Sequence, residues 1–348
     1  MTGPGLDNNF VDELIKSKLL PAMIVTNSPF YCGKINPFKF LVKKGLLILK
    51  YLVKRNAIKR KYQAYFLAKK YSIPIWHSQK VNNDEFAKLI IEMEIDYAFI
   101  FTFGIIKENI FRAPKFGCIN FHPALLPLNR GACPSNYAIL NNQHKTGITF
   151  HFISKSIDAG PIIEQYEIPL SGYETAKILN QYLFSIGATL FVRLIIRLKH
   201  NFKYNLINND ILKGIHEPPF GTESSIISDK NTFQEISLII RASQVYELCA
   251  VYKYLGKEYM VINCIDLTNC NLTIKEFPFF DDKNNIYLKS RDNKVVFLVT
   301  KYSATRNKFS RFIYNIISRS IYPAIILFLL LIGKLLWLYI KVSLFNRI

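Results

Sequence analysis

The chain of 348 residues is half hydrophobic and 14% aromatic, a composition that excludes an intrinsically disordered protein. Its length is enough for about two domains, each with its own core. The net charge of +20 comes from 45 Lys and Arg against 25 Asp and Glu. Two segments without acids carry the excess: residues 34–70 contain twelve bases and residues 301–348 contain eight.

Six cysteines stand singly in the sequence, without the paired spacing of a zinc site or the density of a disulfide framework. The first twenty residues contain three acids and lack the continuous apolar stretch of a secretory signal. Both features predict that the folded part of the protein lies in the reducing cytoplasm.

Near the amino end, residues 34–70 alternate Lys and Arg with Leu, Ile, Val, Phe and Tyr. Basic amphipathic segments of this kind bind membrane surfaces or polyanions. We expect this insert to contact an anionic membrane surface, with RNA as the alternative partner.

The first element expected of the fold is a short apolar strand over residues 21–26. Residues 84–94 then have helical spacing, and residues 97–101 and 117–122 are two further strands. Strands that alternate with helices predict an α/β fold with a doubly wound, mostly parallel, Rossmann-like sheet. Ligands of such sheets lie at the carboxyl ends of the strands.

Asn120 and His122 fall at the carboxyl end of the last of these strands. They are two residues apart, so their side chains share one face, while Ile119 and Phe121 face the other way. An imidazole accepts a proton near pH 7, and a carboxamide donates a hydrogen bond to a developing oxyanion. By itself the pair fits equally well a strand end that satisfies loop backbone.

Further motifs follow in a fixed order. They are Asn120-x-His122-Pro123, Leu126-Pro127-x-x-Arg130-Gly131, a downstream Pro, Gly147-x-Thr149 and Asp158-x-Gly160. With them, the stretch from Pro21 to Arg197 resembles the formyltransferase family that uses 10-formyltetrahydrofolate. The resemblance implies a catalytic trio of Asn120, His122 and Asp158, with 10-formyltetrahydrofolate as co-substrate and no metal. Asn120 and a protonated His122 would stabilise the oxyanion, and Asp158 would orient the imidazole and help to remove the amine proton.

The resemblance also implies where the folate binds, between the loop after the second apolar strand and the loop that carries the aspartate. These loops supply Phe103, Gly104, Ile105 and Ile106, and Ile153, Ser154, Lys155, Ser156 and Ile157. Arg130 and Gly131 are interpreted as shaping the loop after the catalytic strand. His151, on a predicted strand, is interpreted as structural, with a place in the acceptor pocket as the alternative.

After the catalytic part, residues 206–305 show several short alternating strands separated by polar turns. They resemble the small barrel-like carboxyl domain of longer family members. We therefore expect an extension over 1–20, a catalytic domain over 21–205 with the insert 34–70, a β-rich, OB-like domain over 206–305, and a tail over 306–348.

The tail is predicted to associate with a membrane. Residues 321–340 contain thirteen Ile, Leu and Phe and a single charge, Lys334, over the length of a bilayer-spanning helix. A helix buried on the globular part is the alternative, and spanning or lying in the membrane plane is left open. More bases precede this helix than follow it, which predicts a folded part anchored at the cytoplasmic face.

The acceptor is the least specified part. The chain lacks the Lys-x-x-x-Pro-Ser-Pro-Val-like segment usual in methionyl-tRNA formyltransferases. A small-molecule amine, in first place a nucleotide-linked amino sugar, is the favoured acceptor. Methionyl-tRNA is the alternative; a 10-formyltetrahydrofolate hydrolase or a non-catalytic membrane module fits less well.

Overall fold

A computed structural model of the chain describes residues 8–26, 63–101, 103–200, 204–244, 249–270, 274, 276–282 and 284–300. The chain divides into the units Met1–Lys301 and Tyr302–Ile348, and every described element belongs to the first. The predicted tail helix over 321–340 and the greater part of the basic insert, residues 34–62, lie outside the described residues.

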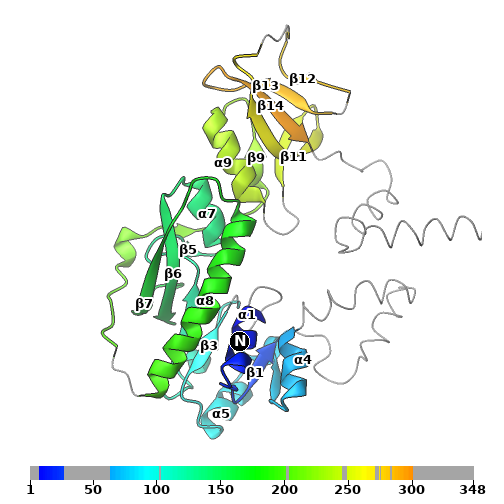
Figure 1. Ribbon diagram of the computed structural model, residues 1–348. Helices are drawn as coiled ribbons and strands as arrows, with labels where there is room; N and C mark the ends of the chain where they lie inside the picture. Colours follow the sequence, from blue (N-terminus) through cyan, green and yellow to red (C-terminus); the bar gives the residue numbers. More distant parts are fainter. Residues whose placement is uncertain are drawn as a thin grey trace, which may run out of the picture. The chain divides into compact units, whose positions relative to one another are not determined.

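Strands and helices alternate through the first part of the chain, as predicted (Figure 1). Strand β1 pairs in parallel with β2, and β3 pairs in parallel with β4. The side chain of Asn83 accepts a hydrogen bond from the Phe86 N–H and so begins α5. The elements are α1 (Asn8–Lys16), β1 (Ile24–Thr26), α4 (Gln63–Lys70), β2 (Ile75–His77), η1 (Ser78–Lys80), α5 (Asp84–Glu92), β3 (Ala98–Ile100), α6 (Glu108–Phe111) and β4 (Cys118–His122).

Beyond β4 the sheet is antiparallel, which differs from the mostly parallel pairing expected. The sheet has the order β3-β4-β6-β7, and both β4–β6 and β6–β7 are antiparallel. The short connection through residues 153–161 explains the β6–β7 pair, because a parallel pair needs a longer crossover, usually with a helix. The β4–β6 connection, residues 123–144, contains α7 and is long enough for either direction. The elements are β5 (Arg130–Gly131), α7 (Pro134–Leu140), β6 (Lys145–Phe152) and β7 (Ile162–Pro169).

The long helix α8 (Ala176–Lys199) covers this sheet (Figure 1). Among the described residues it is the one helix long and apolar enough to cross a membrane, and 44% of its apolar window is buried. Leu183, Phe184 and Phe191 are at most 1% exposed and belong to one core cluster with Ile119 and Phe121 of β4. We therefore interpret α8 as a core helix.

Helix α8 approaches β4 very closely at Gly187. A Cβ at this position would lie 2.3 Å from the ring of Phe121, so a side chain here would collide with that ring. Phe121 is 3% exposed and stands between Asn120 and His122 in β4.

The last eight residues of the predicted basic insert form α4, which packs on the domain through one face. Ala64 and Ala68 are buried in a cluster with Val11 and Ile24. The amphipathic pattern of this part of the insert therefore reflects burial in the domain, with Lys69 and Lys70 on its exposed side.

Residues 226–300 form a six-stranded sheet of order β12-β13-β14-β11-β10-β9, with α9 packed on it. The sequence predicts β10, β11, β13 and β14. A capping box between Thr232 and Glu235 begins α9. The separate OB-like domain and its boundary at residue 206 stay predictions. The elements are η2 (Ile211–Lys213), β8 (His216–Glu217), η3 (Glu223–Ser225), β9 (Ile226–Ile227), α9 (Phe233–Ser243), β10 (Ala250–Tyr254), β11 (Lys257–Asp266), β12 (Phe279–Phe280), β13 (Ile286–Lys289) and β14 (Val295–Thr300).

Candidate functional site

Strand β4 sorts its side chains onto two faces, as its sequence predicts. Ile119 and Phe121 are buried in the core cluster that includes α8. Asn120 and His122 lie on the opposite face, where both contact Asp158. The strand thus places two polar groups side by side above an apolar floor.

Asp158 comes from the loop between β6 and β7, and the structure brings it to this pair. Its Oδ2 lies 3.5 Å from His122 Nδ1, and its Oδ1 accepts a hydrogen bond of 3.3 Å from Asn120 Nδ2. The backbone N–H of Gly131 donates to Oδ2 at 2.8 Å. Arg130 donates from Nε to the Ile157 carbonyl at 3.2 Å, so the Arg-Gly pair shapes this loop, in line with its interpretation.

The backbone around Asp158 is held in an uncommon conformation. Asp158 has φ of 47°, in the left-handed region. Two residues later, a Cβ on Gly160 would lie 1.8 Å from the Phe152 carbonyl oxygen, so this position accepts glycine alone. The amide of Asn209, 6% exposed, donates to the carbonyls of both Asp158 (2.9 Å) and Gly160 (3.1 Å).

Asn209 is therefore a positioning residue that sequence reasoning missed. It fixes two carbonyl oxygens of the loop whose side chain completes the trio. Nothing in the sequence around Asn209 indicates this role, because its contact with the Asp158 loop depends on the isolated pairing of Ile162 with Ile207.

The protonation of His122 follows from its neighbours. Nε2 lies 2.9 Å from the Asn129 carbonyl oxygen, which accepts a hydrogen bond, so Nε2 carries a proton. The side chain of Asn129 exchanges hydrogen bonds with Gln143 at 2.9 and 3.2 Å, which fixes the residue in place. In the neutral imidazole, Nδ1 then keeps its lone pair and faces Asp158.

His151 lies directly across the sheet from Asn120 and joins the trio. Its Nδ1 lies 2.8 Å from the Phe152 carbonyl and donates to it, which leaves Nε2 to accept from Asn120 Nδ2 at 3.2 Å. Nε2 also lies 3.5 Å from Asp158 Oδ1. His151 thus sets the orientation of the Asn120 amide, a role beyond the structural one assigned from the sequence.

Burial and charge act in opposite directions on the pair His122 and Asp158. Burial lowers the pKa of His122, and the attraction of Asp158 offsets this lowering only in part. Burial alone would raise the pKa of Asp158, but the two imidazoles and the Gly131 N–H outweigh it and hold this pKa below its usual range. At neutral pH, an ionised Asp158 therefore faces an uncharged His122.

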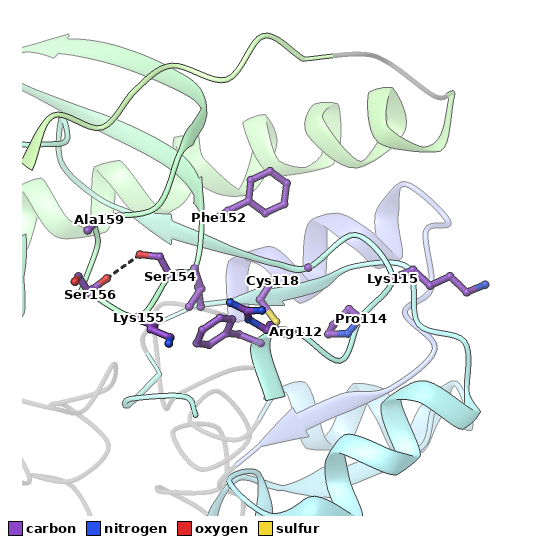
Figure 2. A pocket seen from close by; sticks show the side chains of 12 residues that line it. Arg112, Pro114, Lys115, Cys118, Phe152, Ser154, Lys155, Ser156 and Ala159 are labelled. Atoms are coloured by element: carbon purple, nitrogen blue, oxygen red, sulfur yellow. Dashed lines mark hydrogen bonds between the residues drawn. The ribbon is translucent and has the colours of Figure 1, made fainter. Parts of the chain in front are cut away.

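A cavity of about 790 Å³ opens between the Asp158 loop and the segment that leads into β4 (Figure 2). Figure 2 shows Ser154, Lys155 and Ser156 on one side and Arg112, Pro114 and Cys118 on the other. Burial raises the pKa of the Cys118 thiol to about 12, so this side chain stays an uncharged part of the wall. The lining residues are Phe111, Arg112, Pro114, Lys115, Gly117, Cys118, Phe152, Ile153, Ser154, Lys155, Ser156 and Ala159.

Of the five folate-binding residues predicted in the Asp158 loop, four line this cavity and one does not. Ile153, Ser154, Lys155 and Ser156 line it, whereas Ile157 does not and is 46% exposed. Phe111 and Cys118 line it too, although no motif points to them.

The other predicted folate segment, Phe103 to Ile106, does not line the cavity and lies behind its wall. Ile106 is buried in one cluster with Phe111 and Cys118, and Phe103 and Ile153 pack against that cluster. Gly104 and Ile105 are exposed. Asn82 holds the segment by donating to the Ile105 carbonyl at 2.8 Å and accepting from the Lys107 N–H at 2.9 Å.

Comparison with known proteins gives a consistent picture. The sequence model of the formyl transferase family matches residues 50–195. The methionyl-tRNA formyltransferase of Thermodesulfovibrio yellowstonii is 34% identical over 128 residues, which cover 36% of this chain and 42% of that protein. The corresponding enzyme of Thermotoga neapolitana is 25% identical over 227 residues, 63% of this chain and 72% of that protein.

Among solved structures, an N-formyltransferase from Helicobacter canadensis, in complex with folinic acid and dTDP-3-aminofucose, has a similar fold. Its TM-score is 0.55 at 19% identity, and the superposition covers 86% of this chain and 97% of that one. This likeness supports the α/β fold. In sequence, the chain spans 42% of the length of the Thermodesulfovibrio yellowstonii relative.

Proposed function

Residues 50–195 belong to the formyl transferase family, and from this premise we propose that the chain transfers a formyl group from 10-formyltetrahydrofolate to a primary amine. The observation that carries the proposal is that Asp158 contacts both Asn120 and His122. The loop that carries Asp158 also lines a cavity. In this reaction the amine nitrogen bonds to the formyl carbon as the bond from that carbon to N10 breaks.

The cavity fits the donor in size and chemistry. About 790 Å³ lies within the range of sites for cofactor-sized ligands. Phe111, Phe152 and Ile153 offer apolar surface to a flat ring, and loop backbone groups offer hydrogen bonds. Arg112 and Lys155 both pair with Glu108, at 2.9 and 3.1 Å, and can exchange this exposed partner for the carboxylates of the glutamate part. When bound, 10-formyltetrahydrofolate supplies the activated formyl group.

The trio then stabilises the two charges that the reaction creates, a negative charge on the formyl oxygen and a positive charge on the imidazole. The long hydrogen bonds of Asn120 Nδ2, 3.2 and 3.3 Å, are ones that the formyl oxygen can replace as negative charge develops on it. Nδ1 of the uncharged His122 takes the proton that the amine loses. The resulting imidazolium pairs with the ionised Asp158, which stabilises the charge where it arises. Tetrahydrofolate takes up one proton at N10 as it leaves, so protons balance.

For the acceptor we favour an amino sugar linked to a nucleotide. The Helicobacter canadensis structure, which this chain resembles in fold, holds dTDP-3-aminofucose. Methionyl-tRNA is the second candidate, because the two curated relatives above carry that activity in their names and the net charge of +20 suits a polyanion.

Purified full-length protein should be incubated with 10-formyltetrahydrofolate and, in parallel, with dTDP-linked amino sugars and methionyl-tRNA. We expect a formylated sugar and release of tetrahydrofolate. Formylation of the tRNA alone, with rates that fall steeply between low and physiological salt, would replace the sugar by tRNA. Tetrahydrofolate released with no amine present would indicate a hydrolase.

Two kinds of variant separate chemistry from donor binding. Asn120→Ala, His122→Ala and Asp158→Ala should each lower the rate by about 10² or more, as loss of an oxyanion donor does. Ser154→Trp, which fills the cavity, should raise KM for the donor with kcat nearly unchanged. An unchanged rate in His122→Ala would contradict the catalytic assignment.

A further inference from the structure

Residues 207–217, which we name the crossing segment, contact the Asp158 loop. Ile207 pairs with Ile162, and the amide of Asn209 binds the carbonyls of Asp158 and Gly160. The family model ends at residue 195, so the crossing segment lies outside the part of the chain that the family match covers. Loops that surround a rigid framework commonly carry the residues that bind a ligand. We therefore expect groups that select the acceptor of this chain to lie on such a segment.

The crossing segment also packs on the loop that follows β4. A side chain on Gly214 would collide with the Pro127 carbonyl, so the two backbones are in contact. The N–H of Arg130 donates to the Ile215 carbonyl at 3.2 Å, and the next two residues form β8, which pairs in parallel with β5. Backbone contacts thus hold the crossing segment against both loops that surround the trio.

The pairing of β5 with β8 places His216 beside Gly131. A Cβ on Gly131 would lie 3.2 Å from His216 Nε2, so the imidazole lies against this glycine. Gly131 has φ of 97°, and its N–H donates to Asp158 Oδ2 at 2.8 Å. A single glycine therefore lies between the imidazole and the Asp158 carboxylate.

The imidazole of His216 is available to a ligand. His216 is exposed, and within the described part of the chain its side chain has neither a hydrogen-bond partner nor an ion-pair partner. Its neighbour Glu217, by contrast, accepts a hydrogen bond from Asn141 Nδ2 at 3.2 Å. His216 is not among the residues that line the donor cavity. A ligand that meets this ring therefore lies near Asp158 and outside the donor site.

The position of the base indicates which part of the acceptor comes close to His216. Nδ1 of His122 and the N–H of Gly131 both face Oδ2 of Asp158. An amine that meets Nδ1 therefore brings the neighbouring carbons of its sugar ring toward Gly131 and toward the imidazole beside it. In an amino sugar these carbons carry hydroxyl groups. An imidazole donates at one ring nitrogen and accepts at the other, so it suits a hydroxyl, which does both.

We infer that His216 is a specificity-determining residue, whose imidazole hydrogen-bonds a hydroxyl beside the amine of the acceptor sugar. The inference rests on the proposed function and names a residue that recognises its acceptor. The chemical step is unchanged: the amine nitrogen gains the formyl carbon, N10 loses it, and the amine proton passes to His122. His216 takes no part in this proton transfer.

The test uses the full chain, 10-formyltetrahydrofolate and three dTDP-linked amino sugars. The parent sugar has a hydroxyl on both carbons beside the amine, and each of the two deoxy analogues lacks one of them. His216→Ala removes the imidazole, whereas His216→Gln keeps a donor and an acceptor. The matched control is His144→Ala, at another exposed histidine. The quantities to measure are kcat and KM for each sugar.

We expect His216→Ala to lower kcat/KM for the parent sugar by about three- to tenfold, chiefly through KM, because one hydrogen bond is lost. His216→Gln should recover part of this loss, and His144→Ala should match wild type. One deoxy analogue should have the same kcat/KM in wild type and in His216→Ala, since its partner hydroxyl is already absent. That equality would also show that the variant is folded.

Two results would overturn the inference. The first is an unchanged KM for the parent sugar in His216→Ala. The second is an equal loss for all three sugars, which would mean that the ring only supports the backbone at Gly131. If the wild-type protein formylates none of the sugars, the proposed sugar acceptor itself is wrong, and the inference fails with it.

Discussion

The side-chain amide of Asn209 donates a hydrogen bond of 2.9 Å to the carbonyl oxygen of Asp158, 51 residues earlier in the chain. The same nitrogen binds the Gly160 carbonyl, so one buried amide spans the left-handed turn of the Asp158 loop. The carboxylate of Asp158 is thus fixed from both sides, by Gly131 at the side chain and by Asn209 at the backbone.

Replacing Asn209 should therefore impair turnover more than it impairs folding. We expect Asn209→Ala to lower kcat by about tenfold, with KM for the donor nearly unchanged and a stability loss of about 1–3 kcal/mol for two unpaired carbonyls. Asn209→Asp keeps the shape but presents an ionised acceptor to two carbonyls, and should be at least as damaging. The exposed neighbour provides the control, Asn208→Ala. Wild-type kcat in Asn209→Asp would show that the amide does not position Asp158.

His151 should act mainly through Asn120, although its Nε2 also lies 3.5 Å from Asp158 Oδ1. If His151 orients the Asn120 amide, the single variants His151→Ala and Asn120→Ala remove much of the same contribution, and the double variant should be only slightly slower than Asn120→Ala. The quantity to measure is the coupling free energy from kcat/KM in a double-mutant cycle. Full additivity would mean that His151 contributes separately. His144→Ala, at an exposed position, should leave the rate unchanged.

Gly160 should tolerate no side chain. The Cβ of Gly160→Ala would collide with the Phe152 carbonyl, a backbone atom that cannot yield without moving the end of β6. We expect lost turnover and a lower Tm. At Gly221, by contrast, the nearest atom to a new Cβ lies at 3.9 Å, and Gly221→Ala should behave as wild type in both measurements. Equal Tm values for the two variants would refute the close approach.

Stability should fall as the pH falls, and His122 should contribute to this. Its folded pKa lies below the ordinary value of 6.5, so between these two values the unfolded chain binds a proton that the folded chain does not. The free energy of unfolding then decreases by up to about 1.4 kcal/mol per pH unit as the pH drops through this window. Asp158 adds a loss in stronger acid, below its ordinary value of 3.8, as the pH falls through its lowered pKa.

Melting temperatures between pH 8 and pH 5 check this expectation. His122→Gln should have a flatter profile than wild type in this range. A parallel profile for His122→Gln would mean that the imidazole titrates equally in the folded and unfolded chains.

The sequence predicted the part of the site that depends on local geometry. Alternation along one strand is enough to place Asn120 and His122 together, because side chains two apart share a face. Asp158 was reached through its motif, since nothing in local spacing joins a loop residue to a strand 36 positions away. His151 lies opposite Asn120 only in the antiparallel register of β4 and β6, which the expectation of a mostly parallel sheet did not contain.

Residues that act through the backbone were out of reach for a different reason. Asn129, Gln143 and Asn209 bind carbonyls or each other, and asparagine in a loop satisfies backbone groups in most proteins. Their partners depend on which loops the fold brings together. The strands, including those of the later sheet, were predictable because side chains along a strand alternate between a buried and an exposed face, which gives the sequence a hydrophobic period of two residues.

The contact between Gly187 and the ring of Phe121 gives α8 a second consequence. Phe121 is the residue between Asn120 and His122, and its ring packs directly on the backbone of α8, because Gly187 has no side chain. A side chain added at position 187 would therefore press on β4 between Asn120 and His122, from the face opposite to both.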